Sequence, residues 1–595
     1  MSMLLWLFNV RARSEVRLRI ANLHIKGFRN FVDESIDFDE KTLIIGGNDT
    51  GKSNLLYAIR ILLDPGLSSR DLELSPSDFC IYSDSDCIEI TARLEDVVED
   101  CAISALHGAA EDGASVIRFF LRRNEEYEIL TGPSEDMLEP RNGRTYLKNL
   151  AVEYVGSGRD LSAFIRRQQN RLLDIARNQR TENQEAEDAN SVECIQKDLL
   201  DLNDAISSLH YVRDSLAAVN SEMGAISIGN EGYTARLVAG NTDANKMLDN
   251  LQLAYLYGDS PLVFGGDGRG NQLYFATWMS EQRLNKRPER AIFYAIEEPE
   301  AHLHPHQQRR LAEYLSSSID GQVIITTHSP QIVERFGDGK ILRLAFDNGN
   351  AQASHAHGCS AEVDDALSRM GYRLNAISSE TFFSSGVLLV EGPSERMLYT
   401  ALARSLYEDA DRLNVSILSV DGVGFEPYVR VCIGLGIPYV IRTDNDIFPV
   451  GKTDMRRMAG LQRLLDIVKS HVKDEGLNQL IFSCESALSW SGSDELPSSA
   501  EQARDLLVPE LEKHGLYLSK EADLETDLAC GPLADQLKEF FEAATPHEVV
   551  KTMQRRKAEN MHSFIASDPC LCDLANDPVA TPLDHIVGLA EGRRS

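Results

Sequence analysis

The chain of 595 residues is too long to fold around one hydrophobic core, and this length predicts roughly two to four domains. Its hydrophobic content of 43% and charged content of 26% are typical of a soluble globular protein. The formal net charge of −32 excludes binding of nucleic acid by bulk attraction. Any polyanionic partner must therefore be met by local basic patches or by bound metal ions.

The ten cysteines include no CxxC pair, and the nearest two are Cys570 and Cys572. This pattern indicates neither a zinc ribbon nor a disulfide framework, so a reducing cytoplasm is the simplest location. The opening residues 1–15 are apolar for only about eight positions, and their arginines follow the apolar run. We interpret them as a loose extension, too short for a membrane span and of the wrong polarity for a signal peptide.

A nucleotide-binding motif follows a segment, residues 17–38, that alternates like the strands of a hairpin. The stretch TLIIGGNDTGKSNLLYAI fits GxxxxGK[ST] between a predicted strand at 43–45 and a predicted helix at 53–63. Backbone N–H groups of this loop would wrap phosphate oxygens, Lys52 would reach the β and γ phosphates, and Ser53 would bind Mg²⁺. The candidate nucleotide ligands are Gly46, Asn48, Gly51, Lys52, Ser53 and Asn54.

Long helical patterns occupy about residues 159–255, after β-rich runs such as CIEITARLEDV and SVIRFFLRRN. They indicate an α-helical insertion, in which the polar stretch TENQEAEDANS (181–191) would form the tip of a hairpin. Six arginines against two aspartates between residues 159 and 180 form a candidate patch for phosphate-backbone contact. A solvated helix face is the equally weighted alternative.

Two acidic residues end the strand predicted at 292–296, in RAIFYAIEEPEAHLHPHQQ. In such an arrangement the first carboxylate, Glu297, supports Mg²⁺ and the second, Glu298, polarises the attacking water. The next predicted strand, in QVIITTHSP, ends at His328, which could sense the γ-phosphate. Considered one at a time, Glu297 and Glu298 could instead be acids at the start of a helix, and His328 could be an ordinary polar residue at the end of a strand.

Two further features surround this strand. His302, His304 and His306 alternate around a proline, so they do not share a helix face, and a turn is favoured over a zinc site. Upstream, the glycine-rich FGGDGRGNQ (264–272) precedes a predicted helix. Its Gly268 and Gly270 are candidates for a signature loop that contacts nucleotide from the opposite subunit.

The order of these elements resembles the ABC-type ATPase heads of the SMC, Rad50 and RecF kind. EEPEAHLHP is most similar to the overcoming-lysogenization-defect (OLD) nucleases. The resemblance spans roughly residues 17–345. It implies an ATPase that closes nucleotide between two heads, and hence a homodimer or a tetramer.

In the last third of the chain, carboxylates follow predicted apolar strands. Glu391 ends the strand at 387–390, and Glu395 lies on the next helix; Asp421 ends a second strand, and Asp444 and Asp446 follow a third. Carboxyl ends of parallel strands meet at one edge of a sheet, so these acids would converge there. Without lysine partners they would repel one another, and divalent cations are the natural compensation. Each acid alone is more often solvated surface than a ligand, but the EGxxE and DxD pattern as a whole resembles a Toprim domain.

The OLD resemblance implies a two-metal nuclease site completed by an acidic LE motif and a later lysine. Glu525 and Lys557 match these positions best in order; Lys551 is the alternative lysine, and a solvated helix face is the alternative for the basic run 551–557. The same analogy assigns Glu391, Asp444 and Asp446 to one metal and Glu395, Asp421 and Glu525 to the second. Lys557 would stabilise the developing negative charge.

We therefore expect an α/β protein: the ATPase head in 1–158 and 256–375, a helical insertion and dimerisation arm in 159–255, and a Toprim domain with helical insertions and C-terminal helices in 376–595. The expected function is an ATP-regulated, Mg²⁺- or Mn²⁺-dependent DNA endonuclease of the cytoplasm. A role in bacterial defence against phage follows from family analogy alone. A Toprim topoisomerase or primase and an SMC-like DNA clamp without nuclease activity are the alternatives. A helicase or other partner protein, and whether ATP activates or restrains cleavage, stay open.

Overall fold

The computed structural model describes residues 18–98, 100–106, 109–157, 161–226, 243–249, 255–257, 260–262, 267–284, 290–319, 321–336, 340–346, 354–358, 380–407, 414–422, 424–449, 454–492 and 495–592. The chain divides into two compact units. The first comprises Met1–Val155, Glu289–Glu300 and Pro305–Ser595, and the second comprises Gly156–Pro288 and Ala301–His304. The extension expected for residues 1–15 lies outside the described residues.

An antiparallel sheet begins the first unit and has, in the described ranges, the strand order β2-β1-β4-β6-β7-β8 with β5 paired to β6. Its strands are β1 (Arg19–Phe28), β2 (Phe31–Asp37), β4 (Cys87–Glu95), β5 (Ala110–Glu111), β6 (Ala114–Arg122), β7 (Glu128–Gly132) and β8 (Glu139–Arg141); the short helix α2 spans Asp100–Leu106. Buried and less buried residues alternate along β1, as expected for a sheet with one face in the core. The hairpin predicted for residues 17–38 is confirmed, and it closes where Phe28 pairs with Phe31.

A mostly parallel sheet in the same unit has the order β15-β14-β3-β13-β12-β9. Its strands are β3 (Lys41–Gly46), β9 (Leu150–Val155), β12 (Ala291–Glu297), β13 (Val323–Thr326), β14 (Lys340–Phe346) and the antiparallel edge strand β15 (Ser354–Gly358). The helices are α1 (Lys52–Leu63), α8 (Pro305–Ser318) and α9 (Pro330–Arg335). Because β3, β13 and β12 run parallel in adjacent positions, the segments that follow them emerge at one edge of the sheet.

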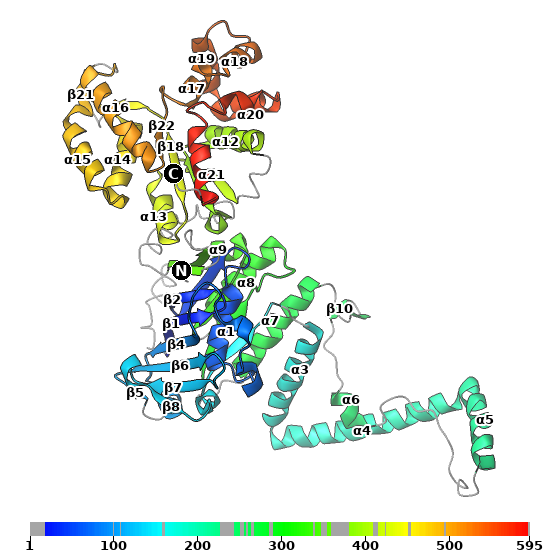
Figure 1. The fold of residues 1–595 in the computed structure, drawn as a ribbon. Helices are drawn as coiled ribbons and strands as arrows, with labels where there is room; N and C mark the ends of the chain where they lie inside the picture. The colour runs from blue at the N-terminus through cyan, green and yellow to red at the C-terminus, as the bar shows by residue number, and fades with distance from the viewer. Residues whose placement is uncertain are drawn as a thin grey trace, which may run out of the picture. The chain divides into compact units, whose positions relative to one another are not determined.

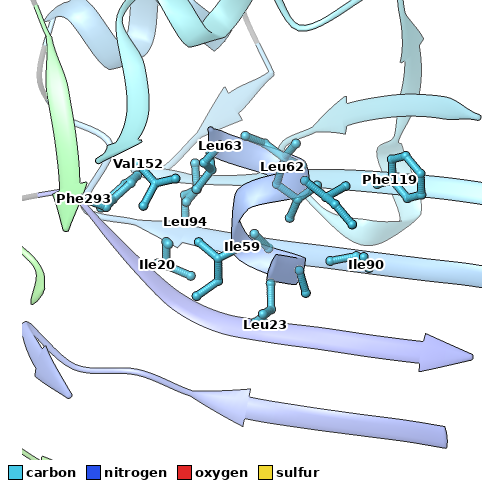
Figure 2. Close-up of a cluster of buried hydrophobic side chains, with 14 of the residues drawn as sticks. Ile20, Leu23, Ile59, Leu62, Leu63, Ile90, Leu94, Phe119, Val152 and Phe293 are labelled. Carbon is cyan, nitrogen blue, oxygen red and sulfur yellow. The ribbon is translucent and has the colours of Figure 1, made fainter. Parts of the chain in front are cut away.

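The core of this region surrounds α1. Figure 2 shows its side chains Ile59, Leu62 and Leu63 in one cluster with Ile20, Leu23, Ile90, Leu94 and Phe119 of the antiparallel sheet and Val152 and Phe293 of the parallel sheet. The two sheets are also joined by the buried Gln322, whose side-chain amide accepts a hydrogen bond from the N–H of Ile20 and donates one to its carbonyl, both at 2.8 Å across 302 residues. The helix that carries the nucleotide motif is therefore fixed by a core to which both sheets contribute.

The second unit is mainly helical. It contains α3 (Leu161–Asn178), α4 (Glu182–Ser208), α5 (His210–Ile226), α6 (Ala244–Asp249), α7 (Asp267–Leu284) and the short strands β10 (Tyr255–Tyr257) and β11 (Ser260–Leu262). The hairpin tip predicted at residues 181–191 is wrong, because this stretch starts α4. Thr181 caps that helix and forms a reciprocal capping box with Gln184, so the polar run is a helix start.

A parallel sheet in the order β17-β16-β18-β22 organises the C-terminal part of the first unit. Its strands are β16 (Gly386–Val390), β17 (Val415–Ser419), β18 (Tyr439–Thr443) and β22 (Leu516–Leu518); β19 (Ile447–Pro449), β20 (Met455–Met458) and β21 (Ser489–Ser491) form a smaller antiparallel sheet. The helices are α12 (Pro393–Leu406), α13 (Glu426–Gly434), α14 (Ala459–His471), α15 (Glu475–Cys484), α16 (Ser498–Lys513), α17 (Leu524–Cys530), α18 (Ala534–Phe540), α19 (Pro546–Arg555), α20 (Lys557–Ala566) and α21 (Thr581–Ala590). Figure 1 shows α12, α20 and α21 together on one side of this sheet, and α14, α15 and α16 on the other.

The strand–helix alternation predicted for the ATPase and Toprim segments is thus present, and the α/β class is confirmed. None of the helices in the described ranges combines the length and the apolar character that crossing a bilayer requires.

Candidate nucleotide and metal sites

The phosphate loop between β3 and α1 depends on two glycines. Gly46 and Gly51 have φ angles of 153° and 104°, in the region that favours glycine. A Cβ atom would stand 2.4 Å from the carbonyl oxygen of Leu344 at the first position and 2.5 Å from the side-chain nitrogen of Asn30 at the second. No larger residue fits either position without a shift of the backbone or of Asn30.

Lys52 is folded onto this loop. Its Nζ donates to the carbonyl oxygens of Gly46 at 3.1 Å and Gly47 at 2.7 Å. Burial lowers the pKa of Lys52 to about 8, while the carboxylates of Glu298 and Glu300 act in the opposite direction. A phosphate group is the partner that would restore full charge to this ammonium.

The two candidate Mg²⁺ ligands of the ATPase site lie in direct contact. Ser53 Oγ donates a hydrogen bond to Glu297 Oε1, and Tyr154 Oη donates to Glu297 Oε2 at 2.5 Å. The structure thus joins the loop after β3 to the end of β12, as the sequence predicted. It adds Tyr154, on β9, which sequence reasoning missed; its ring lies 3.9 Å below the guanidinium carbon of Arg60.

Glu298 and His328 also meet, with His328 Nε2 at 3.0 Å from Glu298 Oε1. Glu298 has a φ of 44°, a conformation that few residues of its type adopt. Burial lowers the pKa of His328, Lys52 adds to that effect, and Glu298 opposes it. Glu300 is a further residue that the sequence did not indicate. It accepts hydrogen bonds from Thr327 Oγ1 at 2.6 Å and from the N–H of His328 at 2.7 Å, and so fixes the segment that carries His328.

The two asparagines of the motif differ in placement. Asn48 is exposed on the loop. Asn54 turns toward the β1–β2 hairpin, where it accepts from Arg29 Nη1 and donates to Asn30 Oδ1, both at 2.8 Å. Its contacts therefore support the hairpin turn beside the loop, and Arg29 is a further residue that the motif did not indicate.

The glycine-rich segment before α7 is only partly described, since residues 263–266 lie outside the described ranges. Gly268 and Gly270 belong to the first turn of α7 itself. A Cβ at Gly268 would stand 2.7 Å from the carbonyl oxygen of His302, so this glycine permits close helix–turn packing. Contact with nucleotide of an opposite subunit stays a prediction. In the described ranges, His302, His304 and His306 are not part of any metal-binding group.

In the C-terminal sheet, the predicted acids gather after β16 and β18. Glu391 Oε1 accepts from Thr443 Oγ1 and Arg463 Nη1, and from the N–H of Asp444 at 3.0 Å. Arg463, on α14, also donates from Nη2 to Asp446 Oδ2 at 3.0 Å. One basic residue therefore bridges Glu391 and Asp446.

A second group surrounds Lys557, the first residue of α20. Its Nζ lies 2.8 Å from Glu525 Oε2, 3.2 Å from Asp523 Oδ2 and 3.7 Å from Asp444 Oδ2. Burial alone would lower the pKa of Lys557, but the three carboxylates, led by Glu525, raise it above its usual range. Lys551 is exposed on α19, so Lys557 is the lysine of this cluster.

The sequence indicated Lys557 at this cluster but not its two arginines. Besides Lys557 and Arg463, the buried Arg442 donates from Nη1 to Asp444 Oδ1 at 3.3 Å and from Nη2 to Asp527 Oδ2 at 3.2 Å. An arginine inside the apolar strand YVIRT is itself a signal, because a buried charge requires a partner. Asp444 thus stands between Lys557 and Arg442.

Two of the predicted metal ligands are deeply buried. Glu395 is only 4% exposed, and burial raises its pKa to about 7; Arg442 opposes this shift, while Asp444 and Glu525 add to it. Burial also raises the pKa of Glu525, against the effect of Lys557. Negative charge is therefore in excess within the cluster, despite its three basic residues.

Asp421 follows β17 in an exposed position with a φ of 45°. Its N–H donates to the carbonyl oxygen of Glu391 at 3.1 Å. Within the described part of the chain, its carboxylate makes no hydrogen bond or ion pair. It is the predicted ligand that is least integrated into the cluster.

The donor set fits a hard divalent cation such as Mg²⁺ or Mn²⁺, since it consists of carboxylate oxygens with an excess of negative charge. In the described ranges, no three of these carboxylates have ligand oxygens that all lie within 4.8 Å of one another. Arg463 is paired with Glu391 and Asp446, and Lys557 is paired with Asp444 and Glu525. Cation binding at these oxygens would compete with both basic side chains.

Together, the fold and the two clusters define an ATPase head joined to a Toprim domain. Two family models match accordingly: "AAA ATPase domain" over residues 19–226 and 268–333, and "Overcoming lysogenization defect protein-like, TOPRIM domain" over residues 382–446. The Toprim match confirms the resemblance to the OLD family that the motifs predicted.

Among curated proteins, the chain is similar to Endonuclease GajA of Bacillus cereus (strain VD045), with 28% identity over 577 residues that cover 92% of this chain and 95% of that protein. It is similar to the OLD nuclease of Thermus scotoductus (strain ATCC 700910 / SA-01), with 25% identity over 72% of this chain and 83% of that protein. A solved structure, the C-terminal region of the Burkholderia pseudomallei OLD protein, matches 35% of this chain and 99% of its own length, with 24% identity and a TM-score of 0.26.

Proposed function

We propose that this protein is an ATP-regulated, divalent-metal-dependent DNA endonuclease, acting as a homo-oligomer in the cytoplasm. The observation that carries the proposal is the position of Asp444, which follows a parallel strand, pairs with Lys557 and Arg442, and neighbours a buried glutamate with a raised pKa. Titratable groups perturbed in this way are typical of functional sites. The nuclease names of the relatives support the same reaction class. A role in defence against phage rests on family analogy alone.

The carboxylates of Glu391, Glu395, Asp444, Asp446 and Glu525 would hold the cations. Bound cations would supply an activated water and stabilise the leaving 3′ oxygen. Lys557 would then exchange its carboxylate partners for the phosphoryl oxygen on which negative charge develops. Asp523 positions this lysine. Its own carboxylate is fixed by hydrogen bonds from Gln554 Nε2 at 2.8 Å and Thr526 Oγ1 at 2.6 Å.

In the ATPase site, Glu298 would accept a proton from the attacking water, and His328, whose Nε2 lies 3.0 Å from Glu298 Oε1, would orient this carboxylate. Lys52 would leave the carbonyls of Gly46 and Gly47 for the β and γ phosphates. Nucleotide would thus be contacted by the segments after β3, β12 and β13 together, and we propose that its occupancy acts as a switch on the nuclease.

The test is nicking of supercoiled plasmid in Mg²⁺ or Mn²⁺, measured beside ATP hydrolysis. Asp444→Asn should reduce cleavage by roughly 100-fold or more, since it removes a carboxylate from the reacting cluster, and should leave ATP hydrolysis within a few fold. Lys52→Ala should abolish ATP hydrolysis. Asp535→Asn, a carboxylate 96% exposed on α18, is the matched control.

Religated topoisomers would replace this proposal with a topoisomerase. Intact plasmid under all metal and nucleotide conditions would replace it with a DNA clamp. Equal loss of both activities in folded Asp444→Asn would contradict the assignment of the two reactions to separate sites.

A further inference from the structure

A cluster of two thiols and a carboxylate lies outside both sites, in the helical region that follows α20. Cys570 Sγ is 2.7 Å from Cys572 Sγ and 3.6 Å from Asp573 Oδ1. All three side chains are exposed, and ligand atoms of the three lie within 4.8 Å of one another. In the described ranges, no other group of three histidine, cysteine or acidic side chains converges in this way. We propose that Cys570, Cys572 and Asp573 bind one thiophilic divalent cation of the zinc class.

The local backbone separates the sulfurs from the core. Cys570 precedes a short 3-10 helix, η10 (Leu571–Leu574), and Cys572 lies within it. Leu571, between the two cysteines, is buried in the same hydrophobic cluster as Leu574, so η10 is anchored on its inner side. The alternation of thiol, leucine and thiol therefore turns both sulfurs outward.

A neighbouring amide orients two of the three ligands. Gln536, on α18, accepts a hydrogen bond from the N–H of Cys570 at 2.9 Å and donates one to Asp573 Oδ2 at 3.0 Å. Since Oδ2 is engaged by Gln536, Oδ1 is the oxygen that faces the Cys570 thiol. A hydrogen-bonded partner that fixes the ligating carboxylate is the usual support of a metal site in a protein.

The donor chemistry selects the cation. Two thiolates, one carboxylate and a water would complete four-coordinate geometry, and sulfur donors favour zinc-like ions over the Mg²⁺ and Mn²⁺ that suit the carboxylates around Asp444. Cation binding would release protons from the thiols.

The location gives the site a structural consequence. η10 packs on α12, the helix that carries Glu395 in its first turn, and α12 packs on α20, which begins at Lys557. Gln536 joins η10 to α18. A cation held by Cys570, Cys572 and Asp573 would hold η10 rigid. It would thereby stabilise α12 and α20, the helices that carry Glu395 and Lys557.

The experiment uses the full chain, purified with a reductant and freed of metal, and Co²⁺ as the probe in excess Mg²⁺. The excess Mg²⁺ occupies the oxygen-only sites, and a thiolate-to-cobalt absorption band reports the sulfurs. We expect the band to saturate at about one equivalent per chain and to vanish when Zn²⁺ is added. The double variant Cys570→Ser/Cys572→Ser should lack the band, whereas Cys194→Ser, which removes an exposed thiol on α4, should keep it.

Gln536→Ala should weaken Co²⁺ binding by about 10- to 100-fold while leaving both thiols in place. Absence of the band in the reduced wild-type protein would overturn the proposal, as would a band that persists in the double variant. If mass spectrometry finds a Cys570–Cys572 disulfide, and the reduced protein takes up no Co²⁺, the pair is a redox couple and the metal site is refuted.

Discussion

Replacing Glu395 with glutamine should stabilise the metal-free protein. Burial raises the pKa of this carboxyl from 4.5 to about 7. A folded-state pKa above the unfolded value means that the folded protein holds the proton more tightly, so this group lowers stability as pH rises from 4.5 to 7. At about 1.4 kcal/mol per pKa unit, the full cost is about 3 kcal/mol above pH 7. Glu395→Gln removes the titration and therefore this cost.

The pH dependence separates this effect from any constant change in packing. From the two pKa values, the gain in the free energy of unfolding should be about 1 kcal/mol at about pH 5.5 and about 3 kcal/mol at about pH 8.5. Denaturant unfolding in EDTA at both pH values measures it. The exposed Glu539, on α18, provides the control Glu539→Gln, for which no such gain is expected. A gain that is no larger at high pH than at low pH would refute the reasoning.

The same carboxylate should make stability depend on metal. A divalent cation that binds only the folded protein stabilises it by mass action. We therefore expect added Mg²⁺ to raise the unfolding midpoint of the wild type more than that of Glu395→Gln, and expect the variant to cleave plasmid poorly. An unchanged response to Mg²⁺ in the variant would mean that Glu395 is not a metal ligand.

Three further variants test other contacts. Lys557→Met should slow plasmid cleavage by roughly 100- to 1000-fold, whereas Lys551→Met, on the exposed face of α19, should change it by less than about threefold. Comparable losses would reject Lys557 as the catalytic lysine. Arg463→Met should lower the Mn²⁺ concentration needed for half-maximal cleavage, because Glu391 and Asp446 lose the guanidinium with which both are paired. A higher Mn²⁺ requirement would show that Arg463 instead holds these two ligands in place. Glu298→Gln should bind ATP but fix the cleavage rate at one extreme in its presence, and a wild-type response to ATP and ADP would exclude the switch.

The sequence predicted those parts of the sites that local patterns encode. Glycine spacing located the phosphate loop, and apolar runs followed by Glu297, Glu391 and Asp444 located the strand ends. The convergence of these acids at a sheet edge was predictable because the carboxyl ends of parallel strands share one edge. The helical character of the insertion also follows from local periodicity. The start of α4 at Thr181 was misread, since polar residues occur both at turns and at helix caps.

The charged partners were not predictable in the same way, because sequence spacing does not record contacts between distant segments. Arg442 meets Asp527 across 85 residues, and Arg463 meets Glu391 across 72. These pairs form only once α14 and α17 have folded against the sheet. These pairs partly neutralise the acids before any metal ion binds, and so reduce the repulsion among the carboxylates.

The two hydrogen bonds between Gln322 and Ile20 join segments that the ribosome makes far apart in time. Strand β3 has β13 and β14 as neighbours, and both lie at or beyond Gln322 in the chain. At about 5 to 20 residues per second, a ribosome needs roughly 15 to 60 s to make the 302 residues between the two partners. During that interval β3 has neither of its neighbouring strands in the described sheet to pair with. Glu391 is translated later still, so the carboxylates of the Toprim sheet emerge only after every strand of the nucleotide-binding sheet has been made.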